Sequence, residues 1–265
     1  MVSVLGISVA VYAALFAFGL FGSDRLIFPR GPSSYKDTSE FIKLGTANGN
    51  KITALYLRNP SATFTLLVSH GNAEDLGDTS DWLEELSNVG FNVFCYDYEG
   101  YGTSEGTPSE RRVYQDERAA YNYLLTRLKT PPNRVIAFGK SLGSGPAVHL
   151  AAREPIAGLI LQSAFTSTFR VLTRIAILPF DKFPNYKDIQ RVHCPVLVVH
   201  GTADRVVAFW HGQELYALAH GPKSCLWVDG ADHNDLEEVA GQRYTNALRA
   251  FAMSLENRAI GSKLP

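Results

Sequence analysis

The chain has 265 residues, a formal net charge of −1, and 46% hydrophobic against 19% charged residues. This length can build one good-sized core, and the composition excludes an intrinsically disordered chain. A net charge near zero gives no electrostatic reason to expect nucleic acid as a partner. The three cysteines, Cys95, Cys194 and Cys225, are widely spaced and odd in number, which favours free thiols in a reducing compartment over a disulfide framework.

Residues 2–22 form an apolar run without a charged side chain. At about 1.5 Å per helical residue, such a run matches the roughly 30 Å hydrocarbon thickness of a bilayer. A cleaved signal peptide is the alternative, but no Lys or Arg precedes the run and its apolar part exceeds the usual ~7–15 residues. We therefore expect residues 1–23 to be a single-pass membrane anchor. The first cations all follow the run, so the positive-inside tendency predicts that the rest of the chain is cytoplasmic.

The remaining chain divides into a linker over 24–37, one folded domain over 38–258 and a tail over 259–265. The turn-rich residues 47–50 separate two strand patterns, which predicts an antiparallel pair over 39–44 and 51–58. Further strands are expected over 64–69, 91–96, 135–138, 156–161, 195–199 and 224–228. The helices expected between and after them cover 80–89, 107–129, 146–152, 208–219 and 235–255.

This order of elements predicts the fold class. Strands that alternate with helices after an antiparallel start indicate an α/β fold, with a mostly parallel eight-stranded sheet and helices on both faces. Ligands of such sheets bind outside the carboxyl ends of the strands. The first helix after the strand over 91–96 begins with Thr107-Pro108-Ser109-Glu110, which has the pattern of a capping box with Thr107 as its N-cap.

The strand over 135–138 ends in Gly139-Lys140-Ser141-Leu142-Gly143. G-x-S-x-G between a strand and a helix is the pattern of a nucleophile elbow, a strained turn that presents the serine hydroxyl at the end of a sheet. The two glycines avoid Cβ clashes where strand and helix nearly touch. The pentapeptide by itself is weak, since roughly one chain in ten of this length would contain it. A glycine-rich loop without a catalytic role is the alternative, and the flanking strand and helix favour the elbow.

A serine hydroxyl is a poor nucleophile near pH 7 and needs a base, which in turn needs an orienting acid. With a nucleophile elbow, the chain order is serine, then Asp or Glu, then His. Asp204 follows the strand over 195–199 and His233 follows the strand over 224–228, so Ser141, Asp204 and His233 are the candidate triad. Asp204 could instead cap the next helix. The backbone N–H groups of Asn72 and Leu142 are the expected oxyanion-hole donors.

The other polar residues near these strand ends receive more modest interpretations. His70 is expected to shape the loop after the strand over 64–69, and Asp97 to fix a tight turn. Asp229, Asp232 and Asp235 flank His233, but no second histidine stands at a ligand-like spacing, so we predict no metal and no cofactor. Lys140 is expected to face solvent or an anionic group of the substrate.

Residues 164–194 connect two strands and are expected to form a small cap over the catalytic end of the sheet. The segment is rich in large apolar residues, of which Phe165, Phe169 and Leu172 are the expected substrate contacts. An apolar cap suits an acyl chain, since each buried CH₂ group contributes about 0.8 kcal/mol. Packing of a short helix over the core explains the same residues equally well.

Five strings carry a family resemblance, in the order SHGNAEDLG, YDYEGYGTSEGTPSE, GKSLG, VLVVHGTADRVV and LWVDGADHNDLE. Over residues 38–258 the chain resembles the α/β-hydrolase superfamily, and within it the α/β-hydrolase-domain protein 17 group and the Bem46-like proteins of fungi. The resemblance implies a serine hydrolase that removes palmitoyl groups from protein cysteines at membranes, with the triad on Ser141, Asp204 and His233. The group usually has Gln where this chain has Lys140. It also anchors through an N-terminal cysteine cluster, where this chain has an apolar run as Bem46-like proteins do.

We therefore expect a monomeric serine hydrolase of acyl esters or thioesters, acting at membranes as a protein depalmitoylase. Its partners would be an acylated protein or a small acyl ester or thioester, and not nucleic acid. A general carboxylesterase or lipase-like enzyme and a serine peptidase remain alternatives, although no acidic cluster that would bind a peptide amine is evident. A catalytically silent scaffold would be expected to lack one of the three triad residues, and all are present.

Overall fold

The computed structural model describes residues 2–261, with side chains from residue 6 to residue 258. Eight strands form one sheet in the order β1-β2-β4-β3-β5-β6-β7-β8. Only the pairs β1–β2 and β2–β4 are antiparallel in this sheet, and the other pairs are parallel. The predicted mostly parallel eight-stranded sheet with an antiparallel start is confirmed. The strands are β1 (Phe41–Gly45), β2 (Lys51–Leu57), β3 (Thr65–Ser69), β4 (Asn92–Tyr96), β5 (Val135–Lys140), β6 (Gly158–Gln162), β7 (Val196–Gly201) and β8 (Lys223–Val228).

Helices cover both faces of the sheet, as predicted. The α-helices are α1 (Val2–Ala17), α2 (Asp24–Ile27), α3 (Ser80–Val89), α4 (Glu110–Thr126), α5 (Ser144–Ala151), α6 (Thr168–Thr173), α7 (Asn185–Asp188), α8 (Trp210–Leu218), α9 (Leu236–Ala240) and α10 (Gln242–Gly261). Short helices of other types are the π turn η1 (Phe18–Gly22) and the 3₁₀ turns η2 (Pro132–Arg134), η3 (Ser141–Gly143) and η4 (Ile189–Arg191).

The two faces of the sheet hold separate apolar cores because side chains alternate along each strand. Leu67 and Ala137 belong to the core that α4, α5 and α8 cover. Their strand neighbours Leu66 and Ile136 belong to the core under α3, α9 and α10. Central parallel strands that are buried on both faces have continuous apolar sequences. This is why the sequence pattern predicts their positions well.

The helices expected over 107–129 and 235–255 differ most from their expected boundaries, and the others agree within about two residues. The helix expected over 235–255 is divided into α9 and α10 at Gly241, whose φ of 50° is left-handed and ends the first helix. The helix expected from Thr107 begins at Glu110, and its N-cap is Ser109 rather than Thr107. The Ser109 hydroxyl accepts a hydrogen bond from the Arg112 N–H at 3.4 Å.

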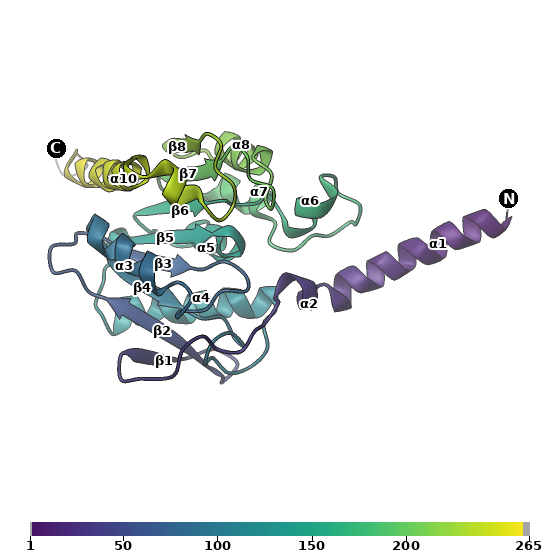
Figure 1. The fold of residues 1–265 in the computed structure, drawn as a ribbon, viewed down its shortest axis with the longest axis horizontal. Helices are drawn as coiled ribbons and strands as arrows, with labels where there is room; N and C mark the ends of the chain where they lie inside the picture. Colours follow the sequence, from purple (N-terminus) through teal and green to yellow (C-terminus); the bar gives the residue numbers. More distant parts are fainter. Residues whose placement is uncertain (1, 262–265) are drawn as a thin grey trace.

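The N-terminal segment departs most from expectation. No helix among residues 2–261 is long and apolar enough to cross a membrane, so the single-pass anchor expected over residues 1–23 is not supported; Met1 itself lies outside the described residues. The regular α-helical part ends at Ala17 after 16 residues, which at 1.5 Å per residue is about 24 Å rather than the ~30 Å of a hydrocarbon core. Figure 1 shows α1 projecting from the body as a rod.

The segment that follows α1 packs against the folded body. Ile27 and Phe28 at the end of α2 are buried in the core beside α4 and α5. Asp24 forms an ion pair with Lys182, which lies in the connection between β6 and β7. The expected linker over 24–37 therefore begins with residues that belong to the packed structure, and the N-terminal segment lies against the cap.

Candidate active site

The turn between β5 and α5 places Ser141 at the carboxyl end of the central strand. Ser141 has a φ of 50°, a left-handed conformation that strains a residue with a Cβ atom. A Cβ atom at Gly139 would lie 2.5 Å from the carbonyl oxygen of Gly143, and one at Gly143 would collide with the carbonyl oxygen of Ser69. Only glycine fits these two positions. At Gly139 the reason is the predicted close approach of strand and helix, whereas at Gly143 it is the backbone at the end of β3.

The loops after β7 and β8 carry the candidate acid and base. These loops are tied together by backbone hydrogen bonds, since Thr202 N–H donates to Val228 O at 2.9 Å and Ala203 N–H donates to Ala231 O at 3.0 Å. Because β7 and β8 are parallel neighbours, both loops leave the same edge of the sheet. Asp204 and His233 converge there, although they are far apart in sequence.

A hydrogen-bonded chain joins the three predicted residues. His233 Nε2 lies 3.0 Å from Ser141 Oγ, and His233 Nδ1 lies 2.8 Å from Asp204 Oδ2. The exposed fractions of Ser141, Asp204 and His233 are 8%, 6% and 8%, so all three residues are largely shielded from solvent. In this geometry the imidazole stands where it can take the serine proton while a carboxylate orients its other nitrogen.

Asp204 is held as an anion by its surroundings. Its Oδ1 accepts hydrogen bonds from the N–H groups of Val206 at 2.9 Å and Val207 at 2.7 Å. Burial alone would raise the pKa of this carboxyl, but hydrogen bonds from His200 and His233 outweigh burial and hold the pKa well below its usual range. The alternative that Asp204 caps the next helix is wrong, because α8 begins only at Trp210.

The three other acids near His233 organise the loops. Asp232 Oδ1 accepts the N–H of Arg205 at 2.9 Å and the backbone N–H of His233 at 2.8 Å. Asp235 Oδ1 accepts the N–H of Asp232 at 2.7 Å, and Asp229 Oδ1 accepts the Thr202 hydroxyl at 3.1 Å. In the described part of the chain no group of three or more His, Cys, Asp or Glu side chains could hold a metal ion.

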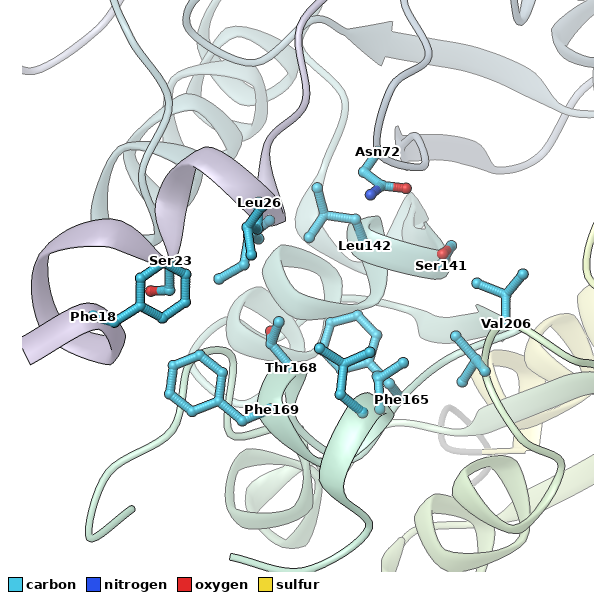
Figure 2. A pocket seen from close by; sticks show the side chains of 14 residues that line it. Phe18, Ser23, Leu26, Asn72, Ser141, Leu142, Phe165, Thr168, Phe169 and Val206 are labelled. Carbon is cyan, nitrogen blue, oxygen red and sulfur yellow. The ribbon is translucent and has the colours of Figure 1, made fainter. Parts of the chain in front are cut away.

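A cavity of about 250 Å³ opens beside Ser141 (Figure 2). Its lining includes every residue expected to contact substrate or oxyanion, namely Phe165, Phe169, Leu172, Asn72 and Leu142. Sequence reasoning missed the other lining residues, which come from the N-terminal segment, the cap and the loop after β7: Phe18, Ser23, Leu26, Ile27, Thr168, Val171, Val206 and Val207. No charged side chain stands among these lining residues.

Comparisons with known proteins place this site in a family. The family described as "Serine aminopeptidase, S33" matches residues 60–179. Human alpha/beta hydrolase domain-containing protein 17B is 44% identical over 224 residues, which cover 83% of this chain and 77% of the relative. The protein 17B of Xenopus laevis is 45% identical over the same shares of the two chains. The chain belongs to the α/β-hydrolase domain-containing protein 17 family.

Solved structures with low sequence identity share the fold of this family 17 hydrolase. The Pyrococcus furiosus esterase Pf2001 superposes with a TM-score of 0.71 at 18% identity, covering 86% of this chain and 98% of that chain. The esterase domain of a Rhodothermus marinus protein gives a TM-score of 0.62 at 18% identity, covering 80% and 97%. These likenesses confirm the α/β-hydrolase fold, and the relatives in the protein 17 group show the family.

The family 17 hydrolase has a second histidine–carboxylate pair, which sequence reasoning treated as two separate residues. His70 Nε2 lies 3.4 Å from Asp97 Oδ1, and both side chains are fully buried. Burial would lower the pKa of His70, but the Asp97 carboxylate more than offsets burial and raises it. The signal that could have found the pair is the parallel register Val68↔Cys95, which places the residues after β3 and β4 side by side.

Lys140 also has an unexpected environment in this hydrolase. Its Nζ lies 2.9 Å from Glu74 Oε1 and 5.0 Å from the centre of the Trp82 ring. Glu74 Oε2 in turn accepts the Gly71 N–H at 3.0 Å. Lys140 therefore points to neither solvent nor substrate. It connects the elbow to the loop that carries Asn72.

Proposed function

We propose that this hydrolase cleaves acyl thioesters and esters through an acyl-enzyme on Ser141, and that acylated cysteine side chains of proteins are its substrates. The observation that carries the proposal is the hydrogen-bonded chain Ser141–His233–Asp204 at the edge of an uncharged, apolar cavity. In this proposal the cavity binds the acyl group of the substrate, and the chain of hydrogen bonds activates Ser141 as the nucleophile.

The first half-reaction forms the acyl-enzyme. Ser141 Oγ attacks the acyl carbonyl carbon while its proton passes to His233 Nε2, and Asp204 stabilises the imidazolium through Nδ1. The negative charge that develops on the carbonyl oxygen is stabilised by the backbone N–H groups of Leu142 and Asn72, whose residues both line the cavity. The carbon–sulfur or carbon–oxygen bond then breaks, and the leaving thiolate or alkoxide takes the proton from His233.

The second half-reaction releases the acid. A water molecule loses a proton to His233 Nε2 and attacks the acyl carbon, and the Ser141 oxygen leaves with that proton. The free carboxylic acid dissociates and the starting state is restored. No step in this scheme requires a metal or a redox cofactor.

The cavity favours an acyl chain over a peptide. Phe165, Phe169 and Leu26 present apolar surface, and each CH₂ group buried there would contribute about 0.8 kcal/mol. A peptidase that recognises a free N-terminus would need an anionic group to bind the ammonium, and none lines the cavity. A general carboxylesterase is the second candidate, because the Pyrococcus furiosus esterase Pf2001 has the same fold.

The N-terminal segment supports action near a lipid surface. Along α1 and η1 large apolar side chains are exposed to solvent, among them Ile7, Val9, Leu15 and Phe21. Contact of these side chains with lipid would place the cavity near acylated proteins, and it would need no span across the membrane.

A labelling and substrate experiment tests the proposal. A fluorophosphonate probe should modify Ser141, as located by mass spectrometry of the labelled peptide. Octanoyl derivatives that differ only in the scissile bond should then rank thioester and ester well above amide. A protein that cleaves the amide best would be a peptidase, and a protein that neither reacts with the probe nor cleaves any of the three would not be a serine hydrolase.

A further inference from the structure

A second cavity lies next to the catalytic one, between the N-terminal segment and the cap. Its volume is about 220 Å³. Three residues line both cavities: Phe18 from η1, and Phe169 and Leu172 from α6. The remaining lining residues come from α1, η1 and the cap, and they are Leu15, Gly19, Thr173, Ala176, Ile177, Leu178, Phe180 and Asp181.

The lining of the second cavity calls for an apolar occupant, because its polar groups already have partners. The Asp181 carboxylate accepts the Ser167 hydroxyl at 2.6 Å and the N–H groups of Phe169 and Lys182, both at 2.8 Å. The Thr173 hydroxyl is hydrogen-bonded to the carbonyl oxygens of Phe169 and Ile175. A polar ligand would lose water here and find few acceptor sites that are not already used, which costs free energy, whereas an apolar ligand gains by burial.

Of the three side chains that line both cavities, Phe169 packs against the core, whereas Phe18 and Leu172 are held by little packing. Phe18 is 48% exposed and Leu172 is 85% exposed. Figure 2 shows Phe18 and Phe169 at the end of the catalytic cavity that is remote from Ser141. A rotamer change of these exposed side chains would join the two spaces into one.

We propose that the second cavity is the distal subsite for a long acyl chain, and that the N-terminal segment is one wall of it. With its carbonyl carbon at Ser141, the chain would pass between Phe18 and Phe169 and place its far methylene groups between α1 and the cap. Each cavity is smaller than the roughly 300–1,000 Å³ of typical ligand pockets, whereas the joined space falls within that range. This inference rests on the proposed acyl hydrolase function and adds a determinant of chain length to it.

Gly19 offers a way to close the subsite. A Cβ atom there would lie 2.7 Å from Leu178 Cδ1 and 3.2 Å from Phe180 Cζ, so any larger side chain would project into the second cavity. The contacts are with the ends of side chains, which can yield. Leucine at this position would therefore fill the subsite and leave the catalytic cavity open.

The experiment measures kcat/KM for butyryl and lauroyl thioesters of one thiol. In Gly19→Leu the lauroyl-to-butyryl ratio should fall about tenfold, which corresponds to the loss of roughly two buried CH₂ contacts. The butyryl value should stay within about twofold. Because both substrates are tested on one preparation, the ratio does not depend on the fraction of protein that is folded.

Phe18→Ala and Phe21→Ala form a matched pair in the same π turn. Phe18 lines both cavities, whereas Phe21 is 86% exposed and lines neither. Phe18→Ala should change the lauroyl-to-butyryl ratio at least about threefold, and Phe21→Ala should leave it unchanged.

An unchanged ratio in both Gly19→Leu and Phe18→Ala would overturn the distal subsite. Equal changes in Phe18→Ala and Phe21→Ala would overturn it too, since they would show a general effect of the turn. Failure of the proposed function has a different signature, because the native protein would then cleave neither thioester.

Discussion

His233–Asp204 and His70–Asp97, two of the buried histidine–carboxylate pairs at the carboxyl edge of the sheet, have similar chemistry and different surroundings. His233 Nδ1 lies 2.8 Å from Asp204 Oδ2, and the other ring nitrogen, His233 Nε2, lies 3.0 Å from Ser141 Oγ. His70 Nε2 lies 3.4 Å from Asp97 Oδ1, and the other ring nitrogen, His70 Nδ1, lies 2.7 Å from the carbonyl oxygen of Gly71. The His70 ring is fully buried and its centre lies 4.4 Å from that of Tyr98.

The difference is why we propose His233 as the general base and assign His70 a structural role. Both rings have a carboxylate partner, so a carboxylate does not identify a base. What matters is the partner of the second nitrogen: a hydroxyl beside a cavity can give up a proton to a substrate reaction, whereas a backbone carbonyl cannot. His70 and Asp97 instead hold the loop that carries Asn72, where Asp97 Oδ1 also accepts the Leu76 N–H at 2.9 Å.

The largest expected effect comes from removing the hydroxyl at Ser141. Ser141→Ala should lower kcat for an acyl thioester by about 10⁶, as loss of the nucleophile does in related triads, and abolish fluorophosphonate labelling. Ser163→Ala is the matched control, because Ser163 is also buried at a strand end with a positive φ of 49°, yet its hydroxyl has no hydrogen-bond partner. Persistent labelling of Ser141→Ala would remove Ser141 from its proposed role.

Changing the two carboxylates separates the two pairs directly. Asp204→Asn should lower kcat by about 10⁴, because it no longer fixes the imidazole tautomer, and should also lower Tm, because a carboxylate whose pKa is depressed on folding stabilises the fold at neutral pH. Asp97→Asn should mainly lower Tm, since it weakens a fully buried pair that has no contact with Ser141. Activity assays and thermal melts of both variants check this.

Asp232→Asn is the control for these two variants, because Asp232 binds the backbone of His233 and not its ring. Its effect on kcat should be far smaller than that of Asp204→Asn. If Asp97→Asn or Asp232→Asn abolished turnover as completely as Asp204→Asn, the division into a catalytic and a structural pair would be wrong.

The sequence predicted the sheet and the candidate site well, and the reasons are local. Strands buried on both faces appear as continuous apolar runs, and Ser141 and Asp204 each follow such a run within a few residues. His233 follows β8, an edge strand that is mostly exposed. Once the strands were assigned, the parallel arrangement placed all three at one edge. The spacing rules of strands and turns carried this inference without any knowledge of side-chain packing.

The rest depended on contacts between segments that are distant in sequence. An apolar run over residues 2–22 has the same pattern whether it lies in lipid or beside a substrate cavity, and only the packed structure places Phe18 and Phe169 at the same cavity. Lys140 pairs with Glu74, and His70 pairs with Asp97, because their loops follow neighbouring strands of the sheet. No spacing in the sequence indicates these pairs. Position 140 could therefore be singled out from the sequence, but its partner could not.

Lys140 gives a more moderate prediction about the loop that carries Asn72. Lys140→Met would break the ion pair with Glu74, and Glu74 would then hold Gly71 N–H less firmly. We expect kcat for a butyryl thioester to fall about tenfold, which is less than the 10²–10³ of losing an oxyanion donor outright.

Lys140→Gln keeps a hydrogen-bond donor and should recover most of the loss in kcat. Arg118→Gln, which breaks the ion pair with Glu154 on the outside of α4 and α5, should have no effect. A change in KM without a change in kcat would contradict the role of Lys140 in positioning this loop.

The smallest expected effect is a difference in how stability depends on pH. Burial raises the pKa of Asp97, and Asp97 in turn raises the pKa of His70 against the effect of burial. Groups whose pKa is raised on folding contribute stability at low pH and lose that contribution as the pH rises through the folded pKa. The ordinary pKa values are about 3.9 for Asp and about 6.5 for His. The stability contribution should therefore begin to fall above about pH 4 for Asp97 and above about pH 6.5 for His70.

The pKa of Asp204 is depressed, so its contribution has the opposite sign: it is present above about pH 4 and is lost as the pH falls. Urea unfolding between about pH 5 and pH 8 should therefore show the stability advantage of the native protein over Asp97→Asn shrinking as the pH rises, while its difference from Asp204→Asn stays level. Asp116, whose pKa burial raises to about 8, titrates in all three proteins and cancels in the differences. A level difference for Asp97→Asn would mean that its pair with His70 does not change protonation on folding, and the contrast between the two pairs would then lie in catalysis alone.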